Sequence, residues 1–202
     1  MEKRVIQSNF EIRAKEGEPT KIVGTAAIVN NQTVLFEEKR QGVTFRLIEI
    51  LKPGAFNDVL KTDVRALFNH DPNMILGRTT AGTMRIALND KGDLIYEVDP
   101  PNTTYANDLQ ESIKRGDISQ SSFGFDFGDV TRTVKETDTE YIVTRTVNTV
   151  AKLYDVSPVT YPATEETVTE MRSKFAGEFK KEQKELKTPN LDKVNQRLRT
   201  RK

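Results

Sequence analysis

His70 is the only histidine in this chain of 202 residues. The unperturbed pKa of histidine lies closest to neutrality among the side chains, so acid–base chemistry by an imidazole has to use this residue. Farther along the chain, a short stretch between Ile118 and Gly124 carries three hydroxyls, those of Ser119, Ser121 and Ser122. Glycine allows backbone angles that other residues resist. One of the serines of this stretch is therefore a candidate nucleophile.

An acid follows in a third stretch. Asp155 lies in an apolar run, with Leu153 and Val156 close to it. Burying a carboxylate costs several kcal/mol unless a donor or a cation pairs with it, and an imidazole N–H would meet that need. Histidine, serine and aspartate together are the groups of nucleophilic acyl transfer, in which the hydroxyl attacks, the imidazole takes its proton and the acid fixes the tautomer of the imidazole.

Two other interpretations of these residues remain open. The chain could be a non-catalytic, β-rich assembly or scaffold module in which Ser122 and His70 take no part in chemistry. It could also be a hydrolase that uses a carboxylate-bound metal, with Asp71 acting together with Asp117 or Asp126. Asp71 is also a good turn residue, because an aspartate side chain readily accepts hydrogen bonds from nearby backbone N–H groups.

Composition excludes several classes of site. The absence of cysteine rules out disulfides, thiolate zinc sites and a cysteine nucleophile, and a single histidine rules out a His-rich metal site. We expect no cofactor. The net charge of +1 gives no basic field, so no direct nucleic-acid role is expected for the body of the protein. The sequence has no long apolar run, so we expect no signal peptide, no membrane span and an intracellular location.

The elements that must position these residues are mostly strands. Apolar and β-branched patterns separated by turn residues predict strands over residues 5–14, 21–29, 43–51, 64–68, 83–88, 94–98, 121–134, 140–147 and 150–160. The first two, and 83–88 with 94–98, are expected to form hairpins, and residues 30–41 a polar loop. Helices are expected over 53–60 and 105–115. The pattern predicts a mainly β, α+β fold in which His70 follows a strand, and Pro158 favours an edge or irregular strand.

The sequence divides near residue 164. We expect one domain over residues 1–164 and a tail over 165–202, where the composition changes. From Met171 to Lys202 the tail has eleven lysines and arginines against four acidic residues, and its apolar residues give it partial helical amphipathicity. It could be a solvated extension, or a segment that docks on an acidic partner or on nucleic acid.

Three motifs together resemble the prohead (capsid maturation) protease family of tailed bacteriophages. They are Asn69-His70-Asp71 followed by residues 75–79, residues 116–125 ending in Phe123-Gly124-Phe125, and residues 153–163. The resemblance implies a serine endopeptidase with a fold similar to that of the herpesvirus assemblins, a compact β-barrel wrapped by helices. It also implies a protease inside the prohead, in the bacterial cytoplasm, that cleaves scaffold segments from the major capsid protein, and cleaves itself.

The resemblance also assigns roles to residues. His70 matches the base of the family and Ser122, directly before Phe-Gly-Phe, matches its nucleophile; Ser119 and Ser121 are the near alternatives. Asp155 stands where the family often has glutamate. Arg78 is a candidate to stabilise the oxyanion, with a structural salt bridge as the alternative. The family further suggests self-association and a removable C-terminal tail, with self-cleavage between Ala163 and Lys187.

Overall fold

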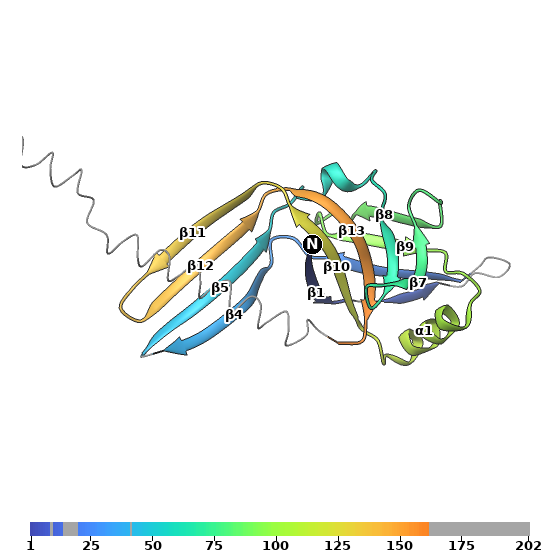
Figure 1. Ribbon diagram of the computed structural model, residues 1–202, viewed down its shortest axis with the longest axis horizontal. Coiled ribbons are helices and arrows are strands. Elements are labelled where there is room, and N and C mark those ends of the chain that lie inside the picture. The colour runs from blue at the N-terminus through green and yellow to red at the C-terminus, as the bar shows by residue number, and fades with distance from the viewer. Residues whose placement is uncertain (9, 14–19, 41, 162–202) are drawn as a thin grey trace, which may run out of the picture. The chain divides into compact units, whose positions relative to one another are not determined.

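The computed structural model describes residues 1–8, 10–13, 20–40 and 42–161 (Figure 1). Sheet A has the strand order β1 (Glu2–Gln7), β10 (Gln120–Phe127), β13 (Val150–Val159), β6 (Arg65–Phe68) and β7 (Asp71–Arg78). Sheet B has the order β2 (Glu11–Arg13), β3 (Lys21–Ala27), β9 (Leu94–Val98) and β8 (Met84–Leu88). Sheet C has the order β11 (Val130–Glu136), β12 (Glu140–Val147), β5 (Val43–Leu51) and β4 (Gln32–Arg40). The tail over 165–202 lies outside the described residues.

The described chain is mainly β, as predicted, but it contains no closed barrel. Each of the three sheets ends in two edge strands, so none of them closes on itself. In the described part of the chain, the helices are α1 (Thr104–Arg115) and the single 3₁₀ turn η1 (Asn57–Val59). The expected barrel wrapped by helices is therefore wrong for these residues. A period-two pattern predicts strands but does not say whether the first and last strand of a sheet meet.

The hydrophobic core contains residues of sheets A and B, helix α1 and turn η1. Tyr96 of β9, Phe123 of β10 and Phe56, next to η1, are buried there together. Helix α1 contributes Ala106, Leu109 and Ile113, the apolar face that the sequence predicts, and it ends at Gly116, whose φ of 82° is the left-handed conformation that glycine adopts easily. The core thus backs the strand that carries the candidate serines.

Several strand boundaries differ from those predicted from the sequence. Residues 32–40, predicted as a loop, form β4. This strand buries Phe36 and leaves most of its other side chains at least partly in solvent, so its sequence is polar enough to resemble a loop. β7 is a second strand that the prediction missed; Pro72 fits there because β7 is an edge strand. The strand predicted over 121–134 is two strands in different sheets, β10 and β11. The predicted N-terminal hairpin is β2 with β3, whereas β1 pairs with β10.

Pro158 lies in β13, which is an interior strand of sheet A rather than an edge. The register of β13 with β6 covers only Asp155 and Val156, so Pro158 lies beyond that ladder on the β6 side. There its carbonyl accepts a hydrogen bond from the backbone N–H of Asn69. The missing N–H of the proline therefore breaks no pairing with β6.

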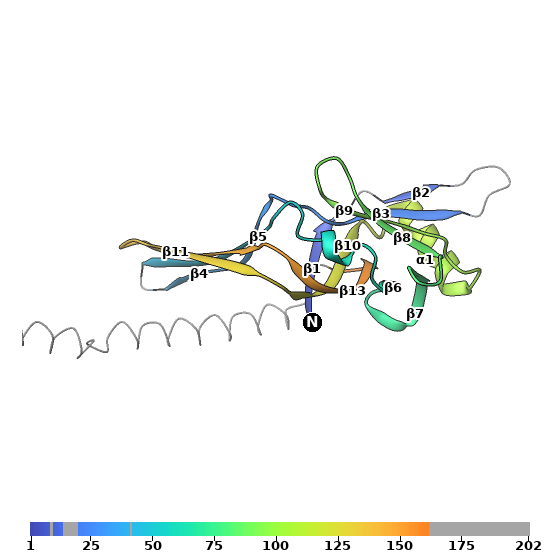
Figure 2. The same ribbon diagram turned by 90° about the horizontal axis from the view of Figure 1, so that it is seen from above.

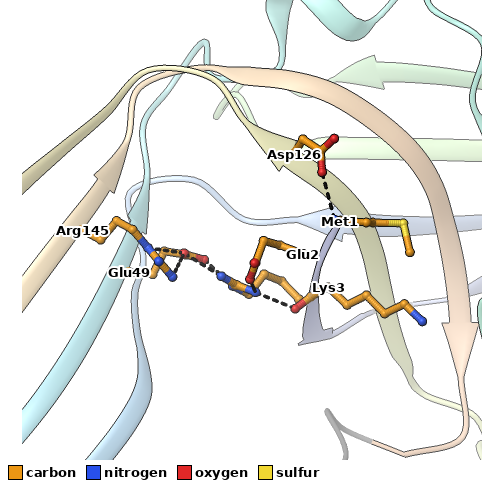
Figure 3. Close-up of polar contacts among 7 residues, drawn as sticks. Met1, Glu2, Lys3, Glu49, Asp126 and Arg145 are labelled. Atoms are coloured by element: carbon orange, nitrogen blue, oxygen red, sulfur yellow. Dashed lines mark hydrogen bonds and ion pairs between the residues drawn. The ribbon is translucent and has the colours of Figure 1, made fainter. Parts of the chain in front are cut away.

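A buried ion cluster joins β1 to sheet C (Figure 3). The guanidinium of Arg4 donates to both carboxylate oxygens of Glu49, at 2.5 and 2.9 Å, and Arg145 donates to Glu49 Oε2 at 3.0 Å from Nε. Arg4 is 6% exposed and Glu49 3%. The two guanidinium groups also lie near the faces of aromatic rings of β10, those of Phe125 and Phe127. This cluster fixes the strand that pairs with β10.

Candidate active site

The only histidine lies in the turn between β6 and β7. His70 and Asn69 both have left-handed backbone angles, with φ of 58° and 55°. Non-glycine residues rarely adopt such angles, and where they do the surrounding structure must hold them. The His70 side chain is 8% exposed. The turn therefore directs an almost buried imidazole toward the outer face of sheet A, the face opposite the core.

The imidazole contacts one of the three candidate serines. The Ser122 Oγ lies 2.6 Å from His70 Nε2, and Ser122 exposes none of its surface. Ser121, the next residue along β10, points to the opposite face, as alternation in a strand requires. There its hydroxyl lies 3.1 Å from the Tyr96 hydroxyl in the core. Burial raises the pKa of Tyr96 above its usual range, so this phenol stays neutral.

The acid binds the other side of the imidazole. Asp155 Oδ1 lies 2.5 Å from His70 Nδ1, and Asp155 is 3% exposed. Since a carboxylate only accepts, Nδ1 carries the proton, which leaves Nε2 free to accept the hydroxyl proton of Ser122. The structure thus brings Asp155, His70 and Ser122 together in one chain of hydrogen bonds, from β13, the β6–β7 turn and β10.

A second serine, Ser157 of β13, belongs to this group and is absent from the residues predicted from the sequence. The Ser157 hydroxyl donates to Asp155 Oδ1 at 2.8 Å and lies 3.4 Å from His70 Nδ1. Ser157 is fully buried and is the register partner of Ser122. The sequence signal is the spacing of two from Asp155, because residues i and i+2 of a strand lie on one face.

Gly124 leaves the space that the acid needs. It is the register partner of Asp155, and a Cβ placed on it would lie 2.6 Å from Asp155 Oδ2 and 3.0 Å from Met1 Sδ. Any larger residue at this position would push the carboxylate away from its place beside His70. Gly124 therefore matters here because it has no side chain, which leaves space for Asp155. The sequence predicts a different reason for this glycine, the freedom of its backbone angles.

Arg78 is held in an ion pair away from these groups. Its Nε and Nη2 donate to the two oxygens of Asp63, both at 2.7 Å. These bonds hold the pKa of the Asp63 carboxyl well below its usual range. Among the described residues, no hydrogen bond joins Arg78 to Ser122 or His70. The structure thus shows the salt bridge that the sequence analysis gave as the alternative to an oxyanion role.

The three aspartates of the metal alternative have other partners. Asp71 Oδ1 accepts the backbone N–H of Asn73, as expected of a turn residue. Asp117 pairs with Arg115, and Asp126 accepts the Tyr154 hydroxyl, which lowers the pKa of Asp126. No group of three or more metal-ligating side chains occurs within residues 1–161 as far as they are described. The same residues include no helix long and apolar enough to span a membrane.

The chain is similar to a family of known proteins and to a solved structure. The family model of the caudovirus prohead serine proteases matches residues 8–182. Among solved structures, the bacteriophage T4 capsid assembly protease, gp21, aligns with 12% identity and a TM-score of 0.34, over 79% of this chain and 99% of that chain. No curated protein sequence matches. Since the family model covers most of the chain, including all three motifs, this protein belongs to the caudovirus prohead serine protease family.

Proposed function

We propose that the chain is a serine endopeptidase that works through an acyl-enzyme, with Ser122 as nucleophile, His70 as base and then acid, and Asp155 as the residue that orients the imidazole. The single observation that carries this proposal is the chain of hydrogen bonds from Asp155 through both nitrogens of His70 to Ser122. Nucleophile, base and orienting acid within hydrogen-bond reach are the general signature of covalent acyl transfer.

In the first half of the reaction, Ser122 Oγ attacks the carbonyl carbon of the peptide while His70 Nε2 takes the hydroxyl proton. The Oγ–C bond forms and a tetrahedral intermediate results. This intermediate collapses as the C–N bond breaks and Nε2 returns the proton to the leaving amine. In the second half, a water molecule attacks the ester carbon while Nε2 takes a proton from that water. The Oγ–C bond then breaks as Nε2 returns the proton to Ser122.

Asp155 remains ionised in this scheme. It holds the Nδ1 proton and stabilises the imidazolium that forms in each half-reaction. Backbone N–H groups near the carbonyl oxygen would stabilise the oxyanion. We assign Arg78 a structural role rather than an oxyanion role, because both of its bonds to Asp63 would have to break first.

Membership of the family supports a proposal for the substrate class. We propose that the chain cleaves the scaffold segment of the major capsid protein inside the prohead, and that it self-associates there. We also propose that it removes its own tail by a cut between Ala163 and Lys187, a region that lies outside the described residues.

Co-expression with the capsid protein tests the proposal, followed by mass spectrometry of both chains. We expect Ser122→Ala to leave both chains uncut, with a rate loss of at least about a thousandfold. Ser121→Ala is the matched control, because Ser121 is equally buried on the same strand but contacts Tyr96. It should cut normally, and a fluorophosphonate probe should label this control and not Ser122→Ala. Normal cutting by Ser122→Ala would refute the proposal.

A further inference from the structure

The turn that carries His70 is fixed by the residue before it. Asn69 and His70 form the two-residue loop between Phe68 of β6 and Asp71 of β7, and both have positive φ, as in the hairpin turns that favour Asn followed by Gly. Histidine stands where this turn prefers glycine, and the contacts of Asn69 help to hold it there.

Asn69 makes four hydrogen bonds to Pro158 and Thr160, at the end of β13 and just after it. Its backbone N–H donates to the Pro158 carbonyl at 3.0 Å. Its side-chain Oδ1 accepts the Thr160 N–H at 2.8 Å, and its Nδ2 donates to Thr160 Oγ1 at 3.0 Å. β13 is the strand that carries Asp155. The turn is therefore bound directly to the strand of the acid rather than only to β6 and β7.

We infer that Asn69 is a positioning residue for the reaction: by binding the His70 turn to the end of β13, it sets the imidazole between Asp155 and Ser122. This inference rests on the proposed function. The two ring contacts measure 2.5 and 2.6 Å, which leaves little room for a displaced turn. A displacement of about 1 Å at a reacting group can cost on the order of a hundredfold in rate.

A simpler role for Asn69 would be to tolerate the left-handed angle, which asparagine does better than most residues. Two substitutions separate these roles. Asn69→Gly adopts the angle freely but removes every side-chain hydrogen bond to Thr160. Asn69→Asp keeps an acceptor for the Thr160 N–H and tolerates the angle. If only the angle matters, glycine is harmless; if the bonds matter, aspartate is the milder change.

The matched control is Thr79→Val. Thr79 pins the opposite end of the β6–β7 hairpin, where its Oγ1 accepts the Val64 N–H at 2.9 Å and donates to the Thr62 carbonyl at 2.7 Å. This substitution removes comparable side-chain bonds from the same hairpin, at the end away from His70.

The experiment uses the full-length chain and two measurements. The first is kcat and KM for cleavage. The second is the nitrogen and proton NMR spectrum of the single imidazole, recorded in the Ser122→Ala background so that the chain stays intact. We expect Asn69→Gly to lower kcat by roughly ten- to a hundredfold at nearly constant KM, and to shift or broaden the signal of the Nδ1 proton that Asp155 holds.

Asn69→Asp should fall between Asn69→Gly and the unmodified chain in both measurements, and Thr79→Val should match the unmodified chain in both. An Asn69→Gly protein with unchanged kcat and an unchanged Nδ1 proton signal would overturn the inference. The NMR measurement does not depend on proteolysis. A chain that cuts nothing would therefore refute the proposed function, while the Nδ1 signal would still report whether Asn69 positions the ring.

Discussion

Ser122 and Ser157 lie directly opposite each other on β10 and β13, and their hydroxyls bind the two ends of one chain of hydrogen bonds. Ser122 contacts His70 Nε2, and Ser157 donates to the Asp155 oxygen that binds His70 Nδ1. The carboxylate therefore has a second donor that does not depend on the histidine. This relationship leads to the first prediction.

Ser157→Ala should slow cleavage without abolishing it. The Asp155 carboxylate would lose one donor, and a hydrogen bond to a charged group is worth about 1.5–3 kcal/mol, which is roughly a ten- to hundredfold loss in kcat. Single-turnover cleavage measures this loss, with Ser121→Ala as the control for removing a buried hydroxyl. A thousandfold loss would instead mean that Ser157 takes part in the chemistry itself.

Gly124→Ala should abolish activity in a protein that still folds. The added Cβ would lie 2.6 Å from Asp155 Oδ2, so the carboxylate must leave its place beside His70. Gly24→Ala is the control, because its Cβ would also meet only side-chain atoms, those of Phe10 at 2.8 Å and Tyr96 at 3.0 Å, outside the site. Circular dichroism should show both proteins folded, and cleavage should be lost only in Gly124→Ala. Full activity in Gly124→Ala would show that the carboxylate can move without consequence.

Arg78→Ala and Asp63→Asn should lower stability to a similar degree and leave kcat unchanged. Because Arg78 lowers the pKa of Asp63, the pair stabilises the fold above the unfolded pKa of about 3.9, and this contribution is lost as the pH falls toward the lower folded value. The stability difference between the unmodified chain and Asp63→Asn should therefore shrink below about pH 4. Urea unfolding across pH measures it. If kcat fell for Arg78→Ala and not for Asp63→Asn, Arg78 would be a residue that stabilises the oxyanion after all.

Glu49→Gln should destabilise the protein strongly. It removes the carboxylate that binds both Arg4 and Arg145 and leaves the buried Arg4 with only the more exposed Glu2, at 3.3 Å, as counter-charge. Breaking a buried ion pair in this way costs about 3–5 kcal/mol. Glu97→Gln is the control, since Glu97 pairs with Lys21 in a half-exposed position, where ion pairs contribute about 1 kcal/mol or less. Chemical unfolding of both proteins should show this difference; equal losses would contradict it.

The sequence was informative about which residues meet and less so about how the strands are arranged. With one histidine in the chain, the base had only one candidate, and the apolar run around Asp155 correctly predicted a buried acid that needs a donor. The resemblance favoured Ser122 over Ser121 as the nucleophile. The structure gives the physical reason, because Ser121 lies on the face of β10 that meets the core, where it contacts Tyr96.

Other features depend on contacts between distant segments, which local patterns do not encode. β4 has a largely polar sequence and becomes a strand because β5 provides its ladder. β7 contains a proline that only an edge strand accepts readily. The contacts of Ser157 and of Asn69 form only once β13 lies beside β10 and the β6–β7 turn. The expected barrel failed for the same reason, because closure depends on how whole sheets meet.

The complete burial of Ser122 limits how a peptide can reach it in the proposed reaction. A peptide carbonyl has to come within about 3–3.5 Å of the serine oxygen before any bond can be cut, yet that atom meets no solvent. In the proposed reaction, part of the outer face must therefore open first, and only a peptide that binds well enough to favour this opening would be cut. We therefore expect the chain to cleave unrelated peptides slowly.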